Sequence, residues 1–251
     1  MPSCSRVAGA LAAAFLALAA SAAHAVEVPV AVAANFTDAA GALGKAFAAK
    51  TRHKAVFSFG ASGALYAQIT QGAPYQLFLS ADQATAKRAI DEGHAVAGTQ
   101  FTYAVGHIVL YSKQPGLVQG EATLRTGAFR KLALANPAAA PYGAAAVQAM
   151  RQLGVYDALA GKIVQGDNIA QTYQFIDTGN AELGFVALSQ VAGVTGGSRW
   201  IVPENLYAPI RQDAVLTKSG ANSAGAKAFL DFLRSAEAAA VIEAFGYGKG
   251  R

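Results

Sequence analysis

Two short segments place small or polar residues where a strand is followed by a helix. They are residues 34–37 (ANFT) and 60–63 (GASG). The first N–H groups of a helix have no partner within the helix and lie at its positive end, and a nearby amide or hydroxyl adds another donor. Such turns can hold an anion. Asn35 and Ser62 also suit the ordinary role of helix N-caps, and the residues alone leave both interpretations open.

A third segment, residues 136–143 (NPAAAPYG), has two prolines ahead of an alanine-rich helical pattern. Proline has no N–H, so the free backbone donors of this turn are expected at Tyr142 and Gly143. Tyr142 can also offer its phenolic O–H, although an aromatic ring that only packs against its neighbours is an equally ordinary explanation.

An enzymatic interpretation finds little in the sequence. Residues 60–64 resemble the G-x-S-x-G nucleophile motif, but Ala64 replaces the last glycine. None of the histidines His53, His94 and His107 stands in a context that supplies a carboxylate partner for a triad. The HExxH, CxxC and GxxxxGK[ST] motifs are also absent from the sequence. We therefore expect no enzyme, and a serine hydrolase is the distant alternative.

The elements that would position these turns follow an alternation of apolar runs and alanine-rich helical patterns, which is typical of βαβ units. We expect strands at residues 28–32, 55–59, 76–80, 106–112, 131–135, 183–188 and 213–217. We expect helices at residues 38–50, 64–71, 81–92, 143–153 and 221–235, with a further segment at 171–179. The pattern has no long linker, so two compact α/β lobes are predicted.

The N-terminus has the layout of a cleaved export signal. Arg6 precedes an apolar run at residues 7–20, and the A-x-A triplet 23–25 follows it. The run is shorter than the roughly 20 residues that span a bilayer, which argues against a membrane anchor. Cys4 precedes the run, whereas a lipid-attachment cysteine would follow it. The mature chain would begin at Val26 and contain no cysteine.

The charge of the chain favours no nucleic-acid partner. Removing Arg6 from the net charge of +5 leaves 5 − 1 = +4 for residues 26–251, and no run of Lys or Arg concentrates it. This mild positive charge permits an anionic ligand without pointing to one.

With these turns in view, the chain resembles the periplasmic molybdate-binding proteins of ABC transporters, usually called ModA. The resemblance covers essentially the whole mature chain. It is carried by the strings AVAANFTDA, FSFGASGALYAQI, GAPYQLFLSAD, FTYAVGHIVLYSK, LANPAAAPYGAAAVQAM, LGFVALSQV and FLDFLRSAEAAAVIEAFGY. It implies an α/β fold of the type II periplasmic binding protein class, with two lobes, each a mostly parallel sheet flanked by helices, and two hinge crossings. The implied boundaries are a signal peptide at 1–25, lobe one at 26–103, lobe two at 104–208 and a return to lobe one at 209–251.

The resemblance also implies a ligand set. The oxyanion-binding positions of the family fall on Asn35, Ser62 and Tyr142, and a backbone N–H of the DNIAQ segment falls on Ile169. Ala34 stands where related chains have a threonine, so it can contribute only its backbone N–H. One branch of the family has a tyrosine where this chain has Ala187, and Tyr142 is expected to take over that hydroxyl's role.

These implications give the expected function. The protein would be a periplasmic, monomeric binder that holds molybdate or tungstate through neutral donors and delivers it to an inner-membrane ABC permease. Molybdenum would be bound only as molybdate, without direct metal ligands and without a cofactor. Donors fixed for long metal–oxygen bonds would lie too far from the oxygens of sulfate. Another tetrahedral oxyanion, such as sulfate or phosphate, is the alternative.

Overall fold

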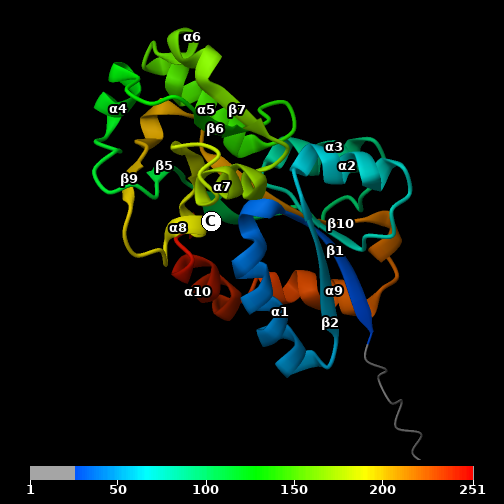
Figure 1. Cartoon of the computed structure of the whole chain (residues 1–251). Helices are drawn as coiled ribbons and strands as arrows, with labels where there is room; N and C mark the ends of the chain where they lie inside the picture. Colours follow the sequence, from blue (N-terminus) through cyan, green and yellow to red (C-terminus); the bar gives the residue numbers. More distant parts are fainter. Residues whose placement is uncertain (1–25, 251) are drawn as a thin grey trace, which may run out of the picture.

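The computed structural model describes residues 26–250, so the predicted signal peptide at 1–25 lies outside the described residues. It contains two β-sheets, of six and five strands, each with helices on both faces (Figure 1). Within residues 26–250, no helix combines the length and the apolar character needed to cross a membrane.

The first sheet has the strand order β11-β4-β10-β3-β1-β2. Its strands are β1 (Glu27–Ala33), β2 (Lys54–Gly60), β3 (Leu77–Leu79), β4 (Phe101–Gly106), β10 (Ile210–Leu216) and β11 (Gly248–Lys249). The pairs β1–β2 and β1–β3 are parallel, whereas β10 runs antiparallel to β3 and β4, and β11 runs antiparallel to β4.

Side chains of the first sheet alternate between two helical layers, as period-2 strand geometry requires. Along β1, Val28, Val30 and Val32 join one hydrophobic cluster, and Ala31 joins another on the opposite face. The first layer is α1 (Thr37–Thr51), α9 (Ala224–Leu233) and α10 (Ala236–Ala244), and the second is α2 (Ser62–Thr70) and α3 (Gln83–Asp91). Short 3-10 turns η1 (Ala34–Phe36) and η4 (Lys218–Gly220) complete the first lobe, by which we mean this sheet with its helices.

The second sheet, in the order β7-β6-β8-β5-β9, is likewise mixed. Its strands are β5 (Ile108–Ser112), β6 (Leu132–Ala135), β7 (Ile163–Gly166), β8 (Leu183–Ala187) and β9 (Ser198–Ile201). The helices α4 (Glu121–Thr126), α5 (Pro141–Gln152) and α6 (Tyr156–Leu159) contribute to the cluster on one face. Helices α7 (Ile169–Asp177) and α8 (Leu188–Val191) contribute to the cluster on the other, and η2 (Ala160–Lys162) and η3 (Glu204–Leu206) complete the second lobe.

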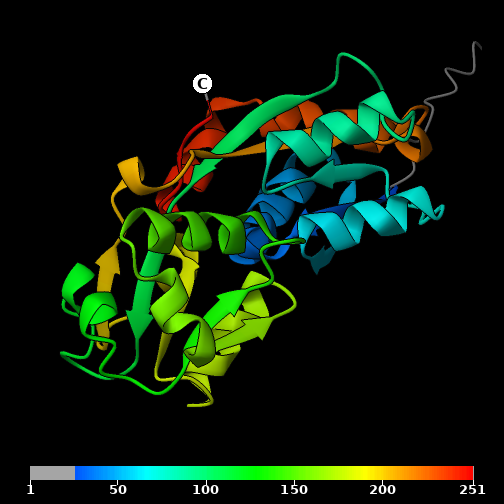
Figure 2. The same cartoon turned by 90° about the horizontal axis from the view of Figure 1, so that it is seen from above.

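The chain passes between the lobes twice, which Figure 2 shows from above. It leaves the first sheet at the end of β4 and returns to it at Ile210. The strand expected at 106–112 is therefore wrong in its extent, because β4 ends at Gly106 and β5 begins at Ile108 in the other sheet. The first crossing lies at His107, a few residues beyond the predicted boundary after residue 103. The two-lobed α/β class is confirmed, but the sheets are mixed rather than mostly parallel.

Candidate functional site

The five residues predicted to bind an oxyanion line one cavity between the lobes. Their exposed fractions are low: Ser62 1%, Tyr142 2%, Asn35 4%, Ile169 4% and Ala34 5%. The other lining residues are Ala33, Gly60, Ala61, Ala81, Ala140, Pro141 and Asn168. The cavity leaves about 10 Å³ for the centre of a water-sized sphere. By this measure the cavity has room for about one water molecule.

Ser62 is held as a hydrogen-bond donor toward this cavity. It is the first residue of α2, and its side chain does not cap the helix. Instead, its Oγ accepts from the backbone N–H of Ala81 at 2.8 Å. No acceptor for the hydroxyl proton, or for the backbone N–H of Ser62, lies among residues 26–250. The ordinary alternative of a helix N-cap therefore does not describe this serine.

Asn35 lies in η1, immediately after β1, and it caps no helix either. Its side-chain amide faces away from solvent and donates to Gln212 Oε1 at 2.8 Å and to Tyr247 Oη at 3.0 Å. The backbone N–H groups of Ala34 and Asn35 have no acceptor within the described part of the chain. This turn therefore offers main-chain donors, while the amide side chain holds the turn in place.

Tyr142 opens α5 directly after Pro141, which occupies the first helical position. Its backbone N–H has no acceptor among residues 26–250, as the sequence predicted. The same prediction was wrong for Gly143, whose N–H donates to Ala140 O at 2.9 Å. Burial holds the pKa of the Tyr142 phenol well above its ordinary value, so the hydroxyl keeps its proton and remains a donor.

Ile169 is the first residue of α7, and the way in which Asn168 caps this helix leaves the Ile169 N–H available. The Oδ1 atom of Asn168 accepts from the N–H groups of Ala170 and Gln171, each at 3.0 Å. This cap satisfies the second and third helical N–H groups and leaves that of Ile169 without an acceptor in the described chain. The helix N-termini of the two lobes thus supply unpaired donors to one small space.

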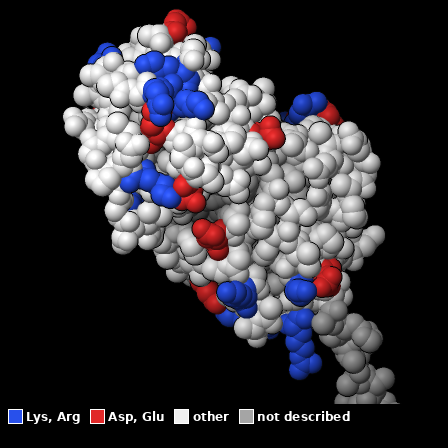
Figure 3. Space-filling model, in the orientation of Figure 1, with Lys and Arg blue, Asp and Glu red and all other residues white. Residues whose placement is uncertain are grey.

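The cavity is electrically neutral in its side chains. Its lining contains no Lys, Arg, His, Asp or Glu. On the face drawn in Figure 3, charged residues form separate groups, and the surface between them is uncharged. Within residues 26–250, no group of three or more His, Cys, Asp or Glu is placed to hold a metal ion. An anion held here would be bound by hydrogen bonds and helix termini rather than by a counter-charge.

The serine hydrolase alternative finds no support in this geometry. No histidine lines the cavity that contains Ser62. His107 does have a carboxylate neighbour, contrary to expectation, because its Nδ1 lies 3.1 Å from Glu204 Oε1. Neither residue of that pair lines the cavity, so the pair cannot activate Ser62.

Contacts on both sides of the cavity join the lobes. On one side, Gly63 N–H of the first lobe donates to Ala139 O of the second at 3.0 Å. On the other, Ser189 Oγ of α8 donates to Asn35 O at 2.9 Å. Sequence reasoning missed Ser189, and it also missed Ala81 and Gln212, because their roles depend on segments that are distant in the chain.

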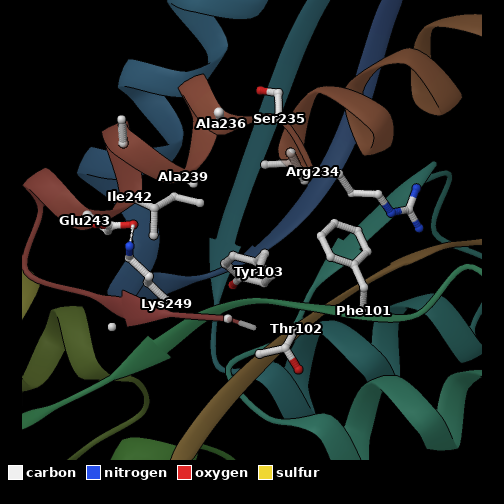
Figure 4. A pocket seen from close by; sticks show the side chains of 14 residues that line it. Phe101, Thr102, Tyr103, Arg234, Ser235, Ala236, Ala239, Ile242, Glu243 and Lys249 are labelled. Carbon is white, nitrogen blue, oxygen red and sulfur yellow. Dashed lines mark ion pairs between the residues drawn. The ribbon is translucent and has the colours of Figure 1, made fainter.

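A second and larger hollow, which we call the C-terminal pocket, lies between α10, β4 and β11 (Figure 4). It leaves about 730 Å³ by the same measure. Its charged side chains have partners in or beside the pocket. Arg234 donates to Asp231 Oδ1 at 3.1 Å and lies over the Phe101 ring at 4.2 Å. Lys249 Nζ lies 3.8 Å from Glu243 Oε1.

The chain crosses twice between two α/β lobes, and the lobes enclose a small cavity lined by unpaired hydrogen-bond donors. These features define a solute-binding protein of the two-lobed type. A family model described as "bacterial extracellular solute-binding protein" matches residues 28–248. The molybdate-binding protein ModA of Rhodobacter capsulatus is 52% identical over 221 residues, 88% of this chain and 88% of that protein. The ModA of Azotobacter vinelandii is 52% identical over 92% of this chain and 93% of its own length.

The solved periplasmic molybdate-binding protein of Azotobacter vinelandii has the same fold, with a TM-score of 0.86 and 40% identity. The match covers 89% of this chain and 100% of that one. The chain belongs to the family of bacterial extracellular solute-binding proteins and, within it, to the group of the ModA proteins. The expected family and the expectation of a transport protein rather than an enzyme are confirmed. Proteins of this family carry no cofactor and bind their solute as a ligand.

Proposed function

We propose that this protein captures molybdate and tungstate in the interlobe cavity and delivers them to an ABC permease. The observation that carries the proposal is a buried, uncharged cavity whose free polar groups are hydrogen-bond donors from four separate turns. The two ModA proteins that are 52% identical to this chain are named for molybdate, which supports the choice of ligand.

The ligand residues are those predicted from the sequence, except that the Asn35 side chain, which was expected to serve the anion, donates to Gln212 and Tyr247 instead. Ser62 donates its hydroxyl and its N–H, while Ala34, Asn35 and Ile169 donate backbone N–H groups. Tyr142 donates its N–H and, in our proposal, its phenolic O–H. Ala187, fully buried at the end of β8, lies outside the cavity lining and offers no side-chain donor.

The chemistry of the lining favours a fully deprotonated oxyanion. Hydrogen bonds to a charged acceptor are the strong ones, and donors fixed on helix termini replace a hydration shell with little reorganisation. Hydrogen phosphate carries a proton that needs an acceptor, and no carboxylate lines the cavity to accept it. Sulfate has shorter bonds than molybdate, so its oxygens would lie farther from donors that are set for the larger ion.

Delivery requires that the lobes open and close, and two chain crossings permit this hinge motion. The moving units would be residues 26–106 with 210–250, which form the first sheet and its helices, and residues 108–209. We further propose that residues 1–25 direct export to the periplasm and are removed, and that the mature protein acts as a monomer without a nucleic-acid partner.

Calorimetric titration of the mature protein against molybdate, tungstate, sulfate and phosphate tests the proposal. Saturable heat with molybdate and tungstate, and none with the other two, is the expected result. Equal affinity for sulfate would reduce the function to general oxyanion binding and remove the size argument.

A further inference from the structure

A buried group of neutral polar side chains lies directly behind the cavity. We call it the amide network, and its members are Asn35, Tyr103, Tyr142, Ser189, Gln212 and Tyr247. Gln212, in β10, is 0% exposed, and it does not line the cavity itself. Burying an amide this completely is costly unless its polar atoms are paired, and here both ends have partners.

The two ends of the Gln212 side chain reach the two lobes. Its Oε1 accepts from Asn35 Nδ2 at 2.8 Å and from Tyr103 Oη at 3.2 Å, both in the first lobe. Its Nε2 donates to Tyr142 Oη of the second lobe at 3.0 Å. One side chain therefore bridges a ligand-facing turn of each lobe.

The hydrogen bonds of Tyr142 determine what its hydroxyl can do. Its Oη accepts from Gln212 Nε2 at 3.0 Å. Asn35 Nδ2 also lies 3.3 Å from this oxygen, but its two protons have nearer acceptors in Gln212 and Tyr247. A phenol has one proton to donate, and here its oxygen is already an acceptor. No acceptor for that proton lies among residues 26–250. Gln212 thus helps to keep the hydroxyl a donor.

The backbone around Gln212 is shaped for this arrangement. The pairing of β10 with β4 shifts in register between Gln212 and Asp213, which leaves Tyr103 as the extra residue of a β-bulge. Bulges of this kind redirect a side chain. Gly106 leaves room for the phenol, because a Cβ at that position would lie 2.7 Å from Tyr142 Cζ and 3.0 Å from Gln212 Nε2.

We propose that Gln212 is a positioning residue for the anion-binding site. It holds the Asn35 turn and the Tyr142 hydroxyl in a fixed position relative to each other and does not contact the ligand. This inference rests on the proposed function. An amide suits the position because it accepts at one end, donates at the other and carries no charge beside an anion. A carboxylate could not donate to Tyr142 unless it were protonated.

The test compares molybdate titrations of the parent, Gln212→Met and Gln212→Glu. Methionine keeps the length and loses the hydrogen bonds, so Kd should rise about tenfold. Combining Gln212→Met with Tyr142→Phe should cost little more than the larger single change, because Gln212 acts through that hydroxyl. For Gln212→Glu, affinity should fall further as pH rises from 6 to 9, since the ionised carboxylate repels the anion, whereas the parent should show no such trend.

The matched control is Gln148→Met. Gln148 also joins two segments, because its Oε1 accepts from Ala208 N at 3.0 Å, but it lies outside the cavity lining and the amide network. It should leave Kd unchanged. If the parent binds molybdate and Gln212→Met is less stable but has the same Kd, the inference is overturned and the proposed function stands. A flat pH profile for Gln212→Glu would also contradict it. A parent that binds no molybdate would overturn the proposed function, and this inference with it.

Discussion

The interlobe cavity is much smaller than the C-terminal pocket, and the two hollows differ in how their polar groups are paired. The pocket between α10 and β4 is far larger, about 730 Å³ against about 10 Å³, and it contains Arg234, Glu243 and Lys249. Its charged groups pair with neighbours of the same lobe. The cavity contains no charge, but the Ser62 hydroxyl and the first N–H groups of its turns and helices, those of Ala34, Asn35, Ser62, Tyr142 and Ile169, lack acceptors within the described chain. Unpaired donors, rather than volume or formal charge, are therefore our reason for proposing the smaller cavity as the binding site.

Ligand-induced stabilisation is the largest effect that would test this comparison. A ligand that binds only the folded state stabilises it by about 4.1 kcal/mol at a concentration of 1,000 times Kd. Molybdate should therefore raise the melting temperature strongly, and sulfate at the same concentration should do little. Ala239→Leu, which narrows the C-terminal pocket, should leave the molybdate shift unchanged. If the shift in melting temperature disappeared in this variant, the ligand would bind in the C-terminal pocket and not in the interlobe cavity.

Ser62→Ala should give the next largest effect, a loss of about 1.5–3 kcal/mol in molybdate binding, the range for a hydrogen bond to a charged group. The variant also leaves the Ala81 N–H without its acceptor, so the unbound protein should lose stability as well. Titration and thermal melting separate these two effects.

The matched serine is Ser235 in the C-terminal pocket, whose side chain accepts from Ala238 N at 3.2 Å as the N-cap of α10. Ser235→Ala should cost about 1 kcal/mol of stability and leave Kd unchanged. If Ser62→Ala behaved in the same way, Ser62 would have only a structural role.

These serines also illustrate what the sequence could predict. The turns at Asn35 and Ser62 were recognisable because each follows a β-branched or aromatic strand and precedes a helical pattern, both of which are local signals. The partner of Ser62 was not predictable, because the Ala81 N–H reaches it from 19 residues further along the chain.

The strand boundaries and the amide network show the same limit. The predicted strand at 106–112 ran across the change of sheets at His107, because propensity does not record which sheet a strand joins. The predicted strand began at Asp213 and so omitted Gln212, whose importance comes from contacts with Asn35 and Tyr142 that only the folded chain creates.

Tyr142→Phe should produce a smaller loss of affinity than Ser62→Ala, about one power of ten and at most two, because the phenol also serves the amide network. The change removes only the hydroxyl and keeps the ring packing. Titration with molybdate gives the answer directly. A Kd equal to that of the parent would show that Tyr142 contributes only its backbone N–H, and the rest of the site would stand.

The smallest expected effect is that of pH on affinity. Burial is the leading cause that raises the pKa of the phenols of Tyr103, Tyr142 and Tyr247 above the ordinary value. They therefore stay protonated in the folded protein, and no carboxylate or histidine lines the cavity, so Kd for molybdate should not change between pH 7 and 9.

Stability should behave differently above that range. The unfolded chain loses its phenolic protons near the ordinary pKa of about 10, while the folded chain retains them. The folded state then binds more protons, so the free energy of unfolding should stay level up to about pH 9 and fall above pH 10. Tyr142→Phe should reduce that fall by up to about 1.4 kcal/mol per pH unit, measured by denaturant unfolding. A Kd that rose between pH 7 and 9, while the free energy of unfolding stayed level, would mean that a titrating group contacts the ligand. The contrast between a neutral cavity and a charged pocket would then be wrong.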